Sequence, residues 1–373
     1  MKPSSAKQKR ICMVVAAVPP SHSGIGAQAM LLARQMRTLG ELPVVLAHRG
    51  QAPTGNGADL VRRCGWGYPR GGRAVLFAIE AGLWLVRHRG EVRVVHLHGG
   101  GVGPISVGAV AHVLGLPVVY KVSRLGDDDP ASAAARGGGK LRRWVITRAR
   151  RVIAISPAIR DACLEAGVDP ARLVEVPNGV DLERFSPLTP NGRVEARRLL
   201  GIPLTGLVSV YVGAVEARKR TTELVRLWTS VAEPDDTLWL VGPVVDPTGS
   251  TDPRVRAPGS VVDPSPYLRS ADLFLFLSSA EGLPNALLEA QAAGLPAIVS
   301  PLRGVHDYVV TTGQNGVVLE DLSAEAFAEA WSCIRSPIVR DALAAGAGVN
   351  AKRFDIRAVA RAYLRVYEEC CHE

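Results

Sequence analysis

The stretch SSAEGLPNALLEA, residues 278–290, decides the fold together with the apolar run at 272–277 that precedes it. The apolar run is typical of a buried strand, and Gly282-Leu283-Pro284 breaks the chain so that a helix can begin near Asn285. Backbone N–H groups at the start of that helix would face the carboxyl edge of the strand, where open α/β sheets bind ligands and an anionic phosphate is stabilised. The stretch therefore predicts a strand–turn–helix unit with an anion site.

Two glutamates belong to this unit. Glu281 lies beside the predicted anion site, and Glu289 lies two turns into the helix, roughly 12 Å along its axis from the first turn at 1.5 Å per residue. That separation suits a second part of a long ligand. The alternative is an ordinary strand–turn–helix unit with two solvated carboxylates, and the spacing alone favours neither.

The composition indicates a folded protein of two domains. The chain of 373 residues exceeds what one core usually supports, and a hydrophobic content of 47% excludes disorder. The six cysteines form no Cys-x-x-Cys pair and have no histidine spacing for zinc, which favours reduced thiols in a cytosolic protein. No apolar stretch has the length of a membrane span. Residues 2–18 resemble a short signal peptide, but an apolar run this short, leading into a glycine loop, favours a first strand.

The charge is uneven along the chain. Residues 1–187 hold 26 Lys and Arg against 13 Asp and Glu, whereas the remainder holds 18 against 22. The densest basic segment, Arg136 to Arg151, has seven basic and no acidic residues. One interpretation is that the segment binds an anionic membrane surface, so that a cytoplasmic protein would be held peripherally at the inner membrane face. The alternative is that it forms a solvated helix face. Nucleic acid is disfavoured because no binding motif accompanies the charge.

Short β-rich runs alternate with helical ones, which predicts parallel strands joined by crossover helices. We expect an α/β protein of two doubly wound parallel-sheet domains, residues 1–187 and 188–353, facing each other across a cleft that holds the site. A connection containing Pro190-Asn191-Gly192 follows the boundary. The expected strands are 11–18, 43–47, 92–97, 117–122, 151–155, 173–176, 207–212, 237–241, 272–277, 297–300 and 316–319. The expected helices are 26–39, 75–87, 105–114, 140–149, 157–166, 218–232, 265–269, 285–293, 324–333, 337–345 and 355–370.

The segment Gly24-Ile25-Gly26-Ala27-Gln28-Ala29 matches the Gly-x-Gly-x-x-Ala dinucleotide fingerprint by letter. Five residues separate it from the preceding strand, and Ala47-His48-Arg49 stands where the fingerprint needs a ribose-binding acid, so a dehydrogenase is disfavoured. A glycine loop that opens a helix remains, in which Gly24 and Gly26 can approach a ligand phosphate or an acceptor closely.

Two acidic or imidazole clusters resemble metal sites. His96 and His98 project to one face at the end of a strand, but no nearby side chain completes a metal site, so we expect His98 to bind a ligand or to cap the strand. Asp127-Asp128-Asp129 lies in a loop flanked by Gly and Pro without a patterned partner, which favours an exposed acidic turn. No metal site is predicted.

The segment Glu216-Ala217-Arg218-Lys219-Arg220-Thr221 places three consecutive cations at the expected start of a helix. Cations there oppose the helix dipole unless an anion lies nearby. A phosphate-binding role is therefore favoured over a solvated charge run.

Taken in order, these motifs make the chain resemble the retaining glycosyltransferases of family 4, which have the GT-B fold. The likeness covers nearly the whole chain and is most specific in the second half. It implies that the last helix, in residues 354–373, crosses back onto the first domain. The residues that carry it are Val212-Gly213, Arg218-Lys219, Glu281 to Glu289, Gly294-Leu295-Pro296, Gly304 and Asn315-Gly316, with His96-Leu97-His98, Pro177-Asn178-Gly179-Val180-Asp181 and Phe185-Ser186-Pro187 in the first half.

The resemblance implies roles for individual residues. Glu281 would contact the donor sugar hydroxyls near the reacting carbon, and Glu289 would hold the nucleotide ribose. Lys219, with Arg218, would bind the diphosphate. The backbone of Gly282, Leu283 and Pro284 would face the sugar and phosphates, Gly26 would lie on the donor side, and His98 and Gly24 would lie on the acceptor side.

Two positions depart from the family pattern. Ala214 stands where the family often has an arginine, so Arg218 or Arg220 would have to supply that charge. Tyr120-Lys121-Val122-Ser123 stands where many members have a histidine, which leaves the acceptor side open.

The resemblance thus implies a retaining, metal-independent, hexosyltransferase-like enzyme that moves a sugar from a nucleotide-diphosphate sugar to a glycan or lipid-linked acceptor in cell-surface polysaccharide or glycolipid synthesis. The donor is a co-substrate, and no cofactor is expected. Cations and N–H groups on the phosphate side would stabilise the leaving diphosphate. The alternatives are a sugar-nucleotide epimerase of the same fold and an inactive sugar-nucleotide-binding protein, which Ala214 keeps open.

Overall fold

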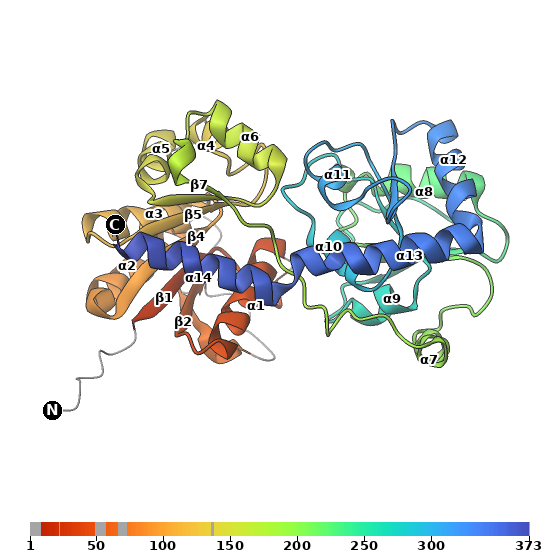
Figure 1. Ribbon diagram of the computed structural model, residues 1–373, viewed down its shortest axis with the longest axis horizontal. Helices are drawn as coiled ribbons and strands as arrows, with labels where there is room; N and C mark the ends of the chain where they lie inside the picture. The colour runs from red at the N-terminus through yellow and green to blue at the C-terminus, as the bar shows by residue number, and fades with distance from the viewer. Residues whose placement is uncertain (1–8, 22, 49–56, 66–72, 136–137, 373) are drawn as a thin grey trace. The chain divides into compact units, whose positions relative to one another are not determined.

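The computed structural model describes residues 9–21, 23–48, 57–65, 73–135 and 138–372. The described chain forms two units, one comprising the residues up to Gly179 together with the last helix, and the other comprising Val180–Asp355 (Figure 1). Each unit is built on its own parallel sheet. The predicted fold class, two Rossmann-like α/β domains, is confirmed.

The sheet of the amino-terminal unit has the strand order β3-β2-β1-β4-β5-β6-β7, with every pair parallel. The order reverses between β1 and β4, which is where open sheets of this kind bind ligands at their carboxyl edge. The strands are β1 (Arg10–Val15), β2 (Pro43–His48), β3 (Val61–Cys64), β4 (Val92–His98), β5 (Val118–Val122), β6 (Arg151–Ala154) and β7 (Leu173–Glu175).

Helices cover both faces of this sheet. Tyr363 and Tyr367 of the last helix lie on the face to which His96 of β4 points, whereas Leu97 points to the other face, against α3. A Cβ on Gly108 of α3 would lie 2.5 Å from Leu97 Cδ1, so glycine lets α3 approach the sheet closely. The helices are α1 (Gly24–Thr38), α2 (Arg73–His88), α3 (Val102–Val113), α4 (Pro130–Ala135), α5 (Gly139–Arg148), α6 (Pro157–Glu165) and α14 (Ile356–His372).

The second unit has the strand order β10-β9-β8-β11-β12-β13, also entirely parallel. Its strands are β8 (Val208–Val212), β9 (Thr237–Val241), β10 (Val255–Gly259), β11 (Leu273–Phe276), β12 (Ala297–Val299) and β13 (Gly316–Val318). Its helices are α7 (Pro190–Leu200), α8 (Thr221–Val231), α9 (Ser265–Ser270), α10 (Asn285–Ala292), α11 (His306–Val309), α12 (Ala324–Arg335) and α13 (Pro337–Ala351). Short 3₁₀ turns lie at η1 (Ala58–Leu60), η2 (Arg89–Glu91), η3 (Pro170–Arg172), η4 (Ala217–Lys219) and η5 (Lys352–Phe354).

Asp272, just before β11, ties the amino edge of the second sheet together. Its carboxylate accepts a hydrogen bond of 2.7 Å from the backbone N–H of Val208 and one of 2.8 Å from Arg197 of α7, and it also pairs with Arg193. Because these bonds hold the start of β8 beside β11, the carboxyl ends of the same two strands lie together at the opposite edge.

The division of the chain differs from the expected one. It falls between Gly179 and Val180 rather than after Pro187, because Arg269 of α9 donates to the Ser186 carbonyl at 2.6 Å and Arg184 pairs with Asp263 at 2.8 Å.

Several elements were not predicted. The expected connection through Pro190 is helix α7, because Thr189 caps it and proline is favoured at a first helical position. Two edge strands were missed because edge strands tolerate charge and proline. Strand β3 has the sequence Val-Arg-Arg-Cys, and strand β10 contains a proline. Helix α4 was also missed.

The acidic loop was predicted wrongly. Asp128 and Asp129 are each only 4% exposed, and their carboxylates accept hydrogen bonds from the backbone N–H groups of Ser123, Arg124, Gly126 and Ser132. They are buried because they satisfy the amides of a tight loop.

Among the described residues, no helix combines the length and apolarity needed to cross a membrane.

Candidate donor site

Close backbone packing shapes the carboxyl ends of β8 and β9. A Cβ on Gly242 would lie 2.0 Å from the Gly213 carbonyl oxygen, and both glycines have φ near +150°, at 147° and 150°. Only glycine fits such an approach with that backbone. The chain then pairs Val215 with Val244 and turns through η4, which brings Arg218 and Lys219 to the carboxyl edge of β11.

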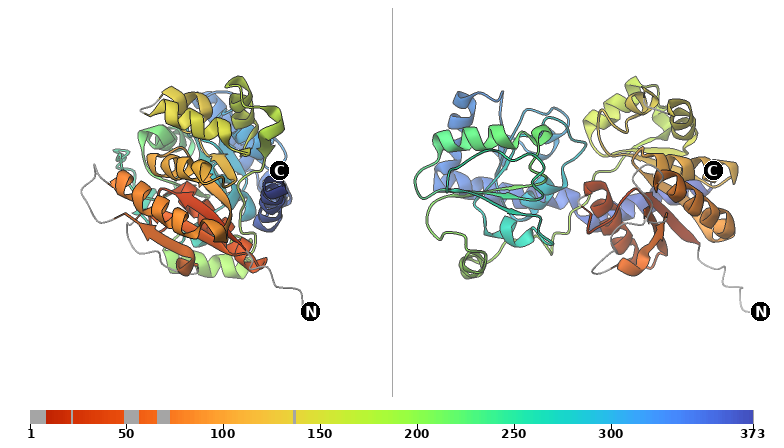
Figure 2. Two further views of the ribbon diagram at one scale, coloured as in Figure 1. Left: turned by 90° about the vertical axis from the view of Figure 1, so that its left-hand side faces the viewer. Right: turned by 180° about the vertical axis from the view of Figure 1, so that it is seen from behind.

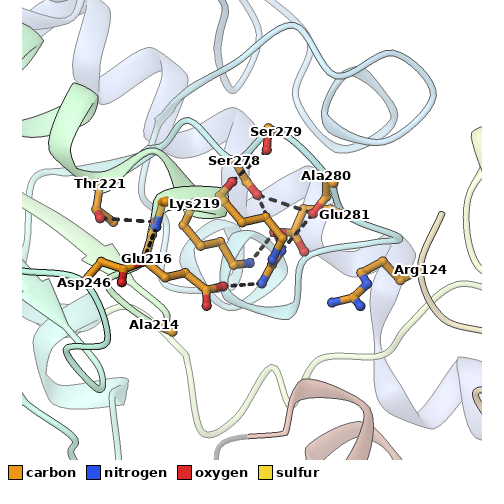
Figure 3. Close-up of polar contacts among 12 residues, drawn as sticks. Arg124, Ala214, Glu216, Lys219, Thr221, Asp246, Ser278, Ser279, Ala280 and Glu281 are labelled. Carbon is orange, nitrogen blue, oxygen red and sulfur yellow. Dashed lines mark hydrogen bonds and ion pairs between the residues drawn. The ribbon is translucent and has the colours of Figure 1, made fainter. Parts of the chain in front are cut away.

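Glu281 is the centre of the polar cluster at this edge (Figure 3). Its Oε1 contacts Lys219 Nζ directly, accepts a hydrogen bond of 2.6 Å from the Ser278 hydroxyl, and lies 3.4 Å from Arg218 Nη1. The Lys219 and Glu281 side chains are 13% and 11% exposed. The structure therefore brings together two residues to which the family resemblance gives separate parts of a donor.

Burial lowers the pKa of Lys219, and the neighbouring Glu281 carboxylate partly opposes that effect. The ammonium group also lies 4.9 Å from the centre of the Phe276 ring. Its cation is thus held in a low-dielectric setting, where an interaction with an anionic ligand is stronger than in water.

Arg218 fastens the two loops of the site to each other. Its carbonyl accepts hydrogen bonds from the Ser279 amide at 3.1 Å and hydroxyl at 2.8 Å, and its guanidinium donates to the Ala280 carbonyl at 3.0 Å. It also pairs with Glu216 at 2.5 Å. The guanidinium is therefore engaged within the protein as well as being placed beside Glu281.

The start of helix α8 differs from the expected one. The three cations precede α8 instead of forming its first turn, and Arg220 has φ of 52°, in the left-handed region that residues other than glycine seldom adopt. Such backbone strain is often found at functional sites.

Ala214 stands where the family often has an arginine. Its carbonyl accepts a 2.7 Å hydrogen bond from the Tyr211 hydroxyl.

Ser278 is supported by Ser300 and His306, which the sequence did not indicate as site residues. The Ser300 hydroxyl donates to the Ser278 carbonyl at 2.8 Å, and His306 Nδ1 lies 2.9 Å from the Ser300 carbonyl oxygen. Ser300 was visible only as the end of an expected strand. Beyond it, a cavity of about 330 Å³ is lined by Pro301, Leu302, Arg303, Asp307, Val318, Leu319 and Glu320.

The loop Gly282-Leu283-Pro284 is buried, and α10 begins at Asn285 as predicted. Glu289 on α10 is half-buried, and burial raises the pKa of its carboxyl to about 7. Arg184 opposes that rise and Asp263 adds to it. Glu289 therefore changes charge near neutral pH.

The remaining predicted site residues lie in the amino-terminal unit. Gly24 begins α1, and a Cβ on Gly26 would lie 1.9 Å from the Ala17 carbonyl oxygen, while the Gly26 amide donates to Ser23. Close packing alone thus requires glycine at position 26. A donor or acceptor role for Gly24 and Gly26 remains a prediction.

His98 is buried, at 2% exposure, and neither ring nitrogen has a hydrogen-bond partner among the described residues. Burial, with smaller effects of His96 and Lys121, holds the pKa of His98 well below its ordinary value. Lys121 donates to Asn178 at 2.8 Å, and burial lowers the pKa of Lys121 to about 7. The sequence did not indicate this buried polar cluster.

Both units match known families. Residues 22–184 match the family model described as Glycosyltransferase Family 4, and residues 206–335 match the one described as Glycosyl transferases group 1. The D-inositol 3-phosphate glycosyltransferase of Actinosynnema mirum is 30% identical over 310 residues, covering 76% of this chain and 68% of that protein.

Two further proteins are similar. The UDP-Gal:alpha-D-GlcNAc-diphosphoundecaprenol alpha-1,3-galactosyltransferase of Escherichia coli is 28% identical, covering 66% of this chain and 67% of that protein. The crystal structure of Anabaena Alr3699/HepE in complex with UDP-glucose covers 96% of this chain and 99% of its own, with a TM-score of 0.79 and 18% identity. This last likeness concerns the fold.

Proposed function

The chain belongs to glycosyltransferase family 4 of the group 1 glycosyl transferases, and we propose that it transfers a sugar from a nucleotide-diphosphate sugar to a glycan or lipid-linked acceptor. The observation that carries this proposal is the direct pairing of Lys219 with Glu281 at the carboxyl edge of the second sheet. A donor carries its diphosphate next to its sugar ring. A cation and a hydrogen-bond-accepting carboxylate at one place match those two parts.

In the proposed reaction, the bond between the sugar carbon and the diphosphate oxygen breaks while that carbon forms a bond to the acceptor oxygen. The acceptor proton passes to the leaving diphosphate. Negative charge builds on the diphosphate, so Lys219, Arg218 and the backbone N–H groups near Pro284 would supply most of the stabilisation. No protein nucleophile is needed, which suits retention of configuration on the front face without a metal.

Glu281 would hold the sugar hydroxyls, with Ser278 keeping its carboxylate in place. Glu289 would hold the nucleotide ribose, with Gly282, Leu283 and Pro284 facing the phosphates. The relatives are named for D-inositol 3-phosphate and for a GlcNAc-diphosphoundecaprenol, which supports an acceptor that is polar or carried on a lipid diphosphate. No disulfide links cysteines among the described residues, and reduced thiols would fit a cytoplasmic enzyme.

The test is a panel of UDP-, GDP- and ADP-sugars, screened first by thermal shift. A donor at 100 times its dissociation constant stabilises the protein by about 2.7 kcal/mol, a readily measured rise in Tm. Product analysis follows, with donor alone and with glycan or lipid-linked acceptors. An altered donor without acceptor would indicate an epimerase, binding without any product would indicate an inactive binding protein, and the absence of any stabilising donor would contradict the proposal.

A further inference from the structure

Helix α2 exposes large apolar side chains along its whole length. They are spaced by four, four and three residues, which places them on one face of the helix. We call them the α2 row: Val75, Ile79, Leu83 and Val86, with exposed fractions of 56%, 51%, 64% and 48%. The opposite face is also apolar and is buried, through Phe77, Ala81, Trp84 and Leu85.

The helix therefore has no polar outer face. Between residues 74 and 86 the only ionisable side chain is Glu80, which is half-buried and accepts a 3.0 Å hydrogen bond from the Gly65 amide. A surface helix normally turns charged residues to water, and an extended exposed apolar row marks an interaction surface.

Cations lie at one end of the α2 row and on a helix two places away. Arg87 and Arg89 are exposed at the carboxyl end of α2. Helix α3 lies beside α2, and α5 lies beside α3 (Figure 2, left). On α5, Lys140 and Arg143 are exposed, and Glu80 is the only acidic residue in the three helices. This face of the amino-terminal unit is thus both apolar and positively charged.

We infer that the α2 row docks on an anionic lipid surface. At 16 residues, α2 is shorter than the ~20 residues that a spanning helix needs, but it has the composition of a helix lying in the plane of an interface, with cations beside it to attract anionic headgroups. A second copy of the chain fits less well. A symmetric contact through α2 would place the cations of one copy against those of the other.

This surface shares only Lys140 and Arg143 with the basic segment that the sequence suggested. Arg142 is buried and donates to the Gly100 carbonyl, and Arg150 and Arg151 are half-buried. Those three arginines contribute little exposed charge. The apolar contribution from α2, on the other hand, could be seen only once its outer face was known.

The experiment uses the full chain without donor, sedimented with vesicles of phosphatidylcholine alone or mixed with phosphatidylglycerol. We expect binding to the mixed vesicles, and at least a tenfold loss of the partition coefficient in the double variant Ile79→Ser, Leu83→Ser. The matched control is Ile338→Ser, Val349→Ser on α13, whose side chains are 83% and 66% exposed, and it should bind as wild type. Lys140→Gln with Arg143→Gln should weaken binding and make it less sensitive to salt.

Three results would overturn the inference: no binding by the wild type, equal binding by the Ile79→Ser, Leu83→Ser variant, or equal losses in the α13 control. A wild-type dimer in sedimentation velocity that the α2 variant dissociates would assign the surface to a second copy instead. Thermal unfolding confirms that each variant is folded. Because no donor is present, failure here leaves the proposed transfer reaction unaffected, and failure of transfer leaves vesicle binding interpretable.

Discussion

Replacing Glu281 by glutamine removes the anion that Lys219 and Arg218 share. Lys219 then keeps a cation in a site whose burial already lowers its pKa. Breaking a buried ion pair costs roughly 3–5 kcal/mol. Because the side chains are still 11–13% exposed, and Arg218 retains its pairing with Glu216, we expect a loss of about 3 kcal/mol in the free energy of unfolding.

The measurement is urea unfolding at pH 7. The matched control is Glu175→Gln, which removes a carboxylate from an exposed pair with Arg160, with side chains 47% and 40% exposed, and should cost at most about 1 kcal/mol. Adding Lys219→Met to Glu281→Gln should recover much of the lost stability, because no uncompensated charge remains. Affinity for the donor identified by the panel should stay lost in this double variant.

Two results would refute this reasoning. The first is a Glu281→Gln variant as stable as wild type, which would mean that water already screens the pair. The second is a double variant whose loss of stability equals the sum of the losses in Glu281→Gln alone and Lys219→Met alone. Residues that form a pair must show coupling between their substitutions. Full donor affinity in the double variant would contradict the site assignment independently of stability.

Further predictions concern single residues. The pKa of Glu289 is raised to about 7, so donor affinity should increase as pH rises through 7 and the carboxylate forms, and isothermal titration of Glu289→Gln should show no such increase. The pKa of Lys121 is lowered to about 7 from its ordinary 10.5, so the unfolded chain binds more protons between these values and stability rises with pH there, by about 2 kcal/mol from pH 7 to 9. Urea unfolding of Lys121→Met should lack that rise. Arg220→Gly should raise the free energy of unfolding by about 1 kcal/mol by relieving left-handed backbone, and it should weaken donor affinity if Arg220 supplies the cation missing at Ala214.

Local patterns in the sequence predicted much of the second unit. The start of α10 at Asn285 follows from the break at Pro284, and β8, β9 and β11 follow from their apolar runs. Pro190 misled the prediction of α7 because proline both breaks helices and begins them, and only the capping Thr189 distinguishes the two. The motifs also sufficed to indicate the family, which the comparisons confirm.

The donor site needed the tertiary structure. The sequence marked Lys219 and Glu281 as candidates with separate roles, but they lie 62 positions apart. They meet because β8 and β11 are neighbours in the sheet although β9 and β10 intervene in the chain. Strand order depends on the packing of the whole unit, and no local pattern records it.

Burial was decided in the same way. His98 ends a strand, as predicted, but it is buried, and the centre of its ring lies 4.0 Å from that of His96. Tyr363 and Tyr367 of α14 pack on His96, and Tyr367 bonds His96 across 271 positions of the chain. The residue types, the start of α10 and the family are thus properties of the sequence itself, since propensity and motif spacing act over a few residues. Which carboxylate keeps its charge, which cation it meets and which apolar face stays exposed depend on contacts between distant segments, and only the folded structure decides them.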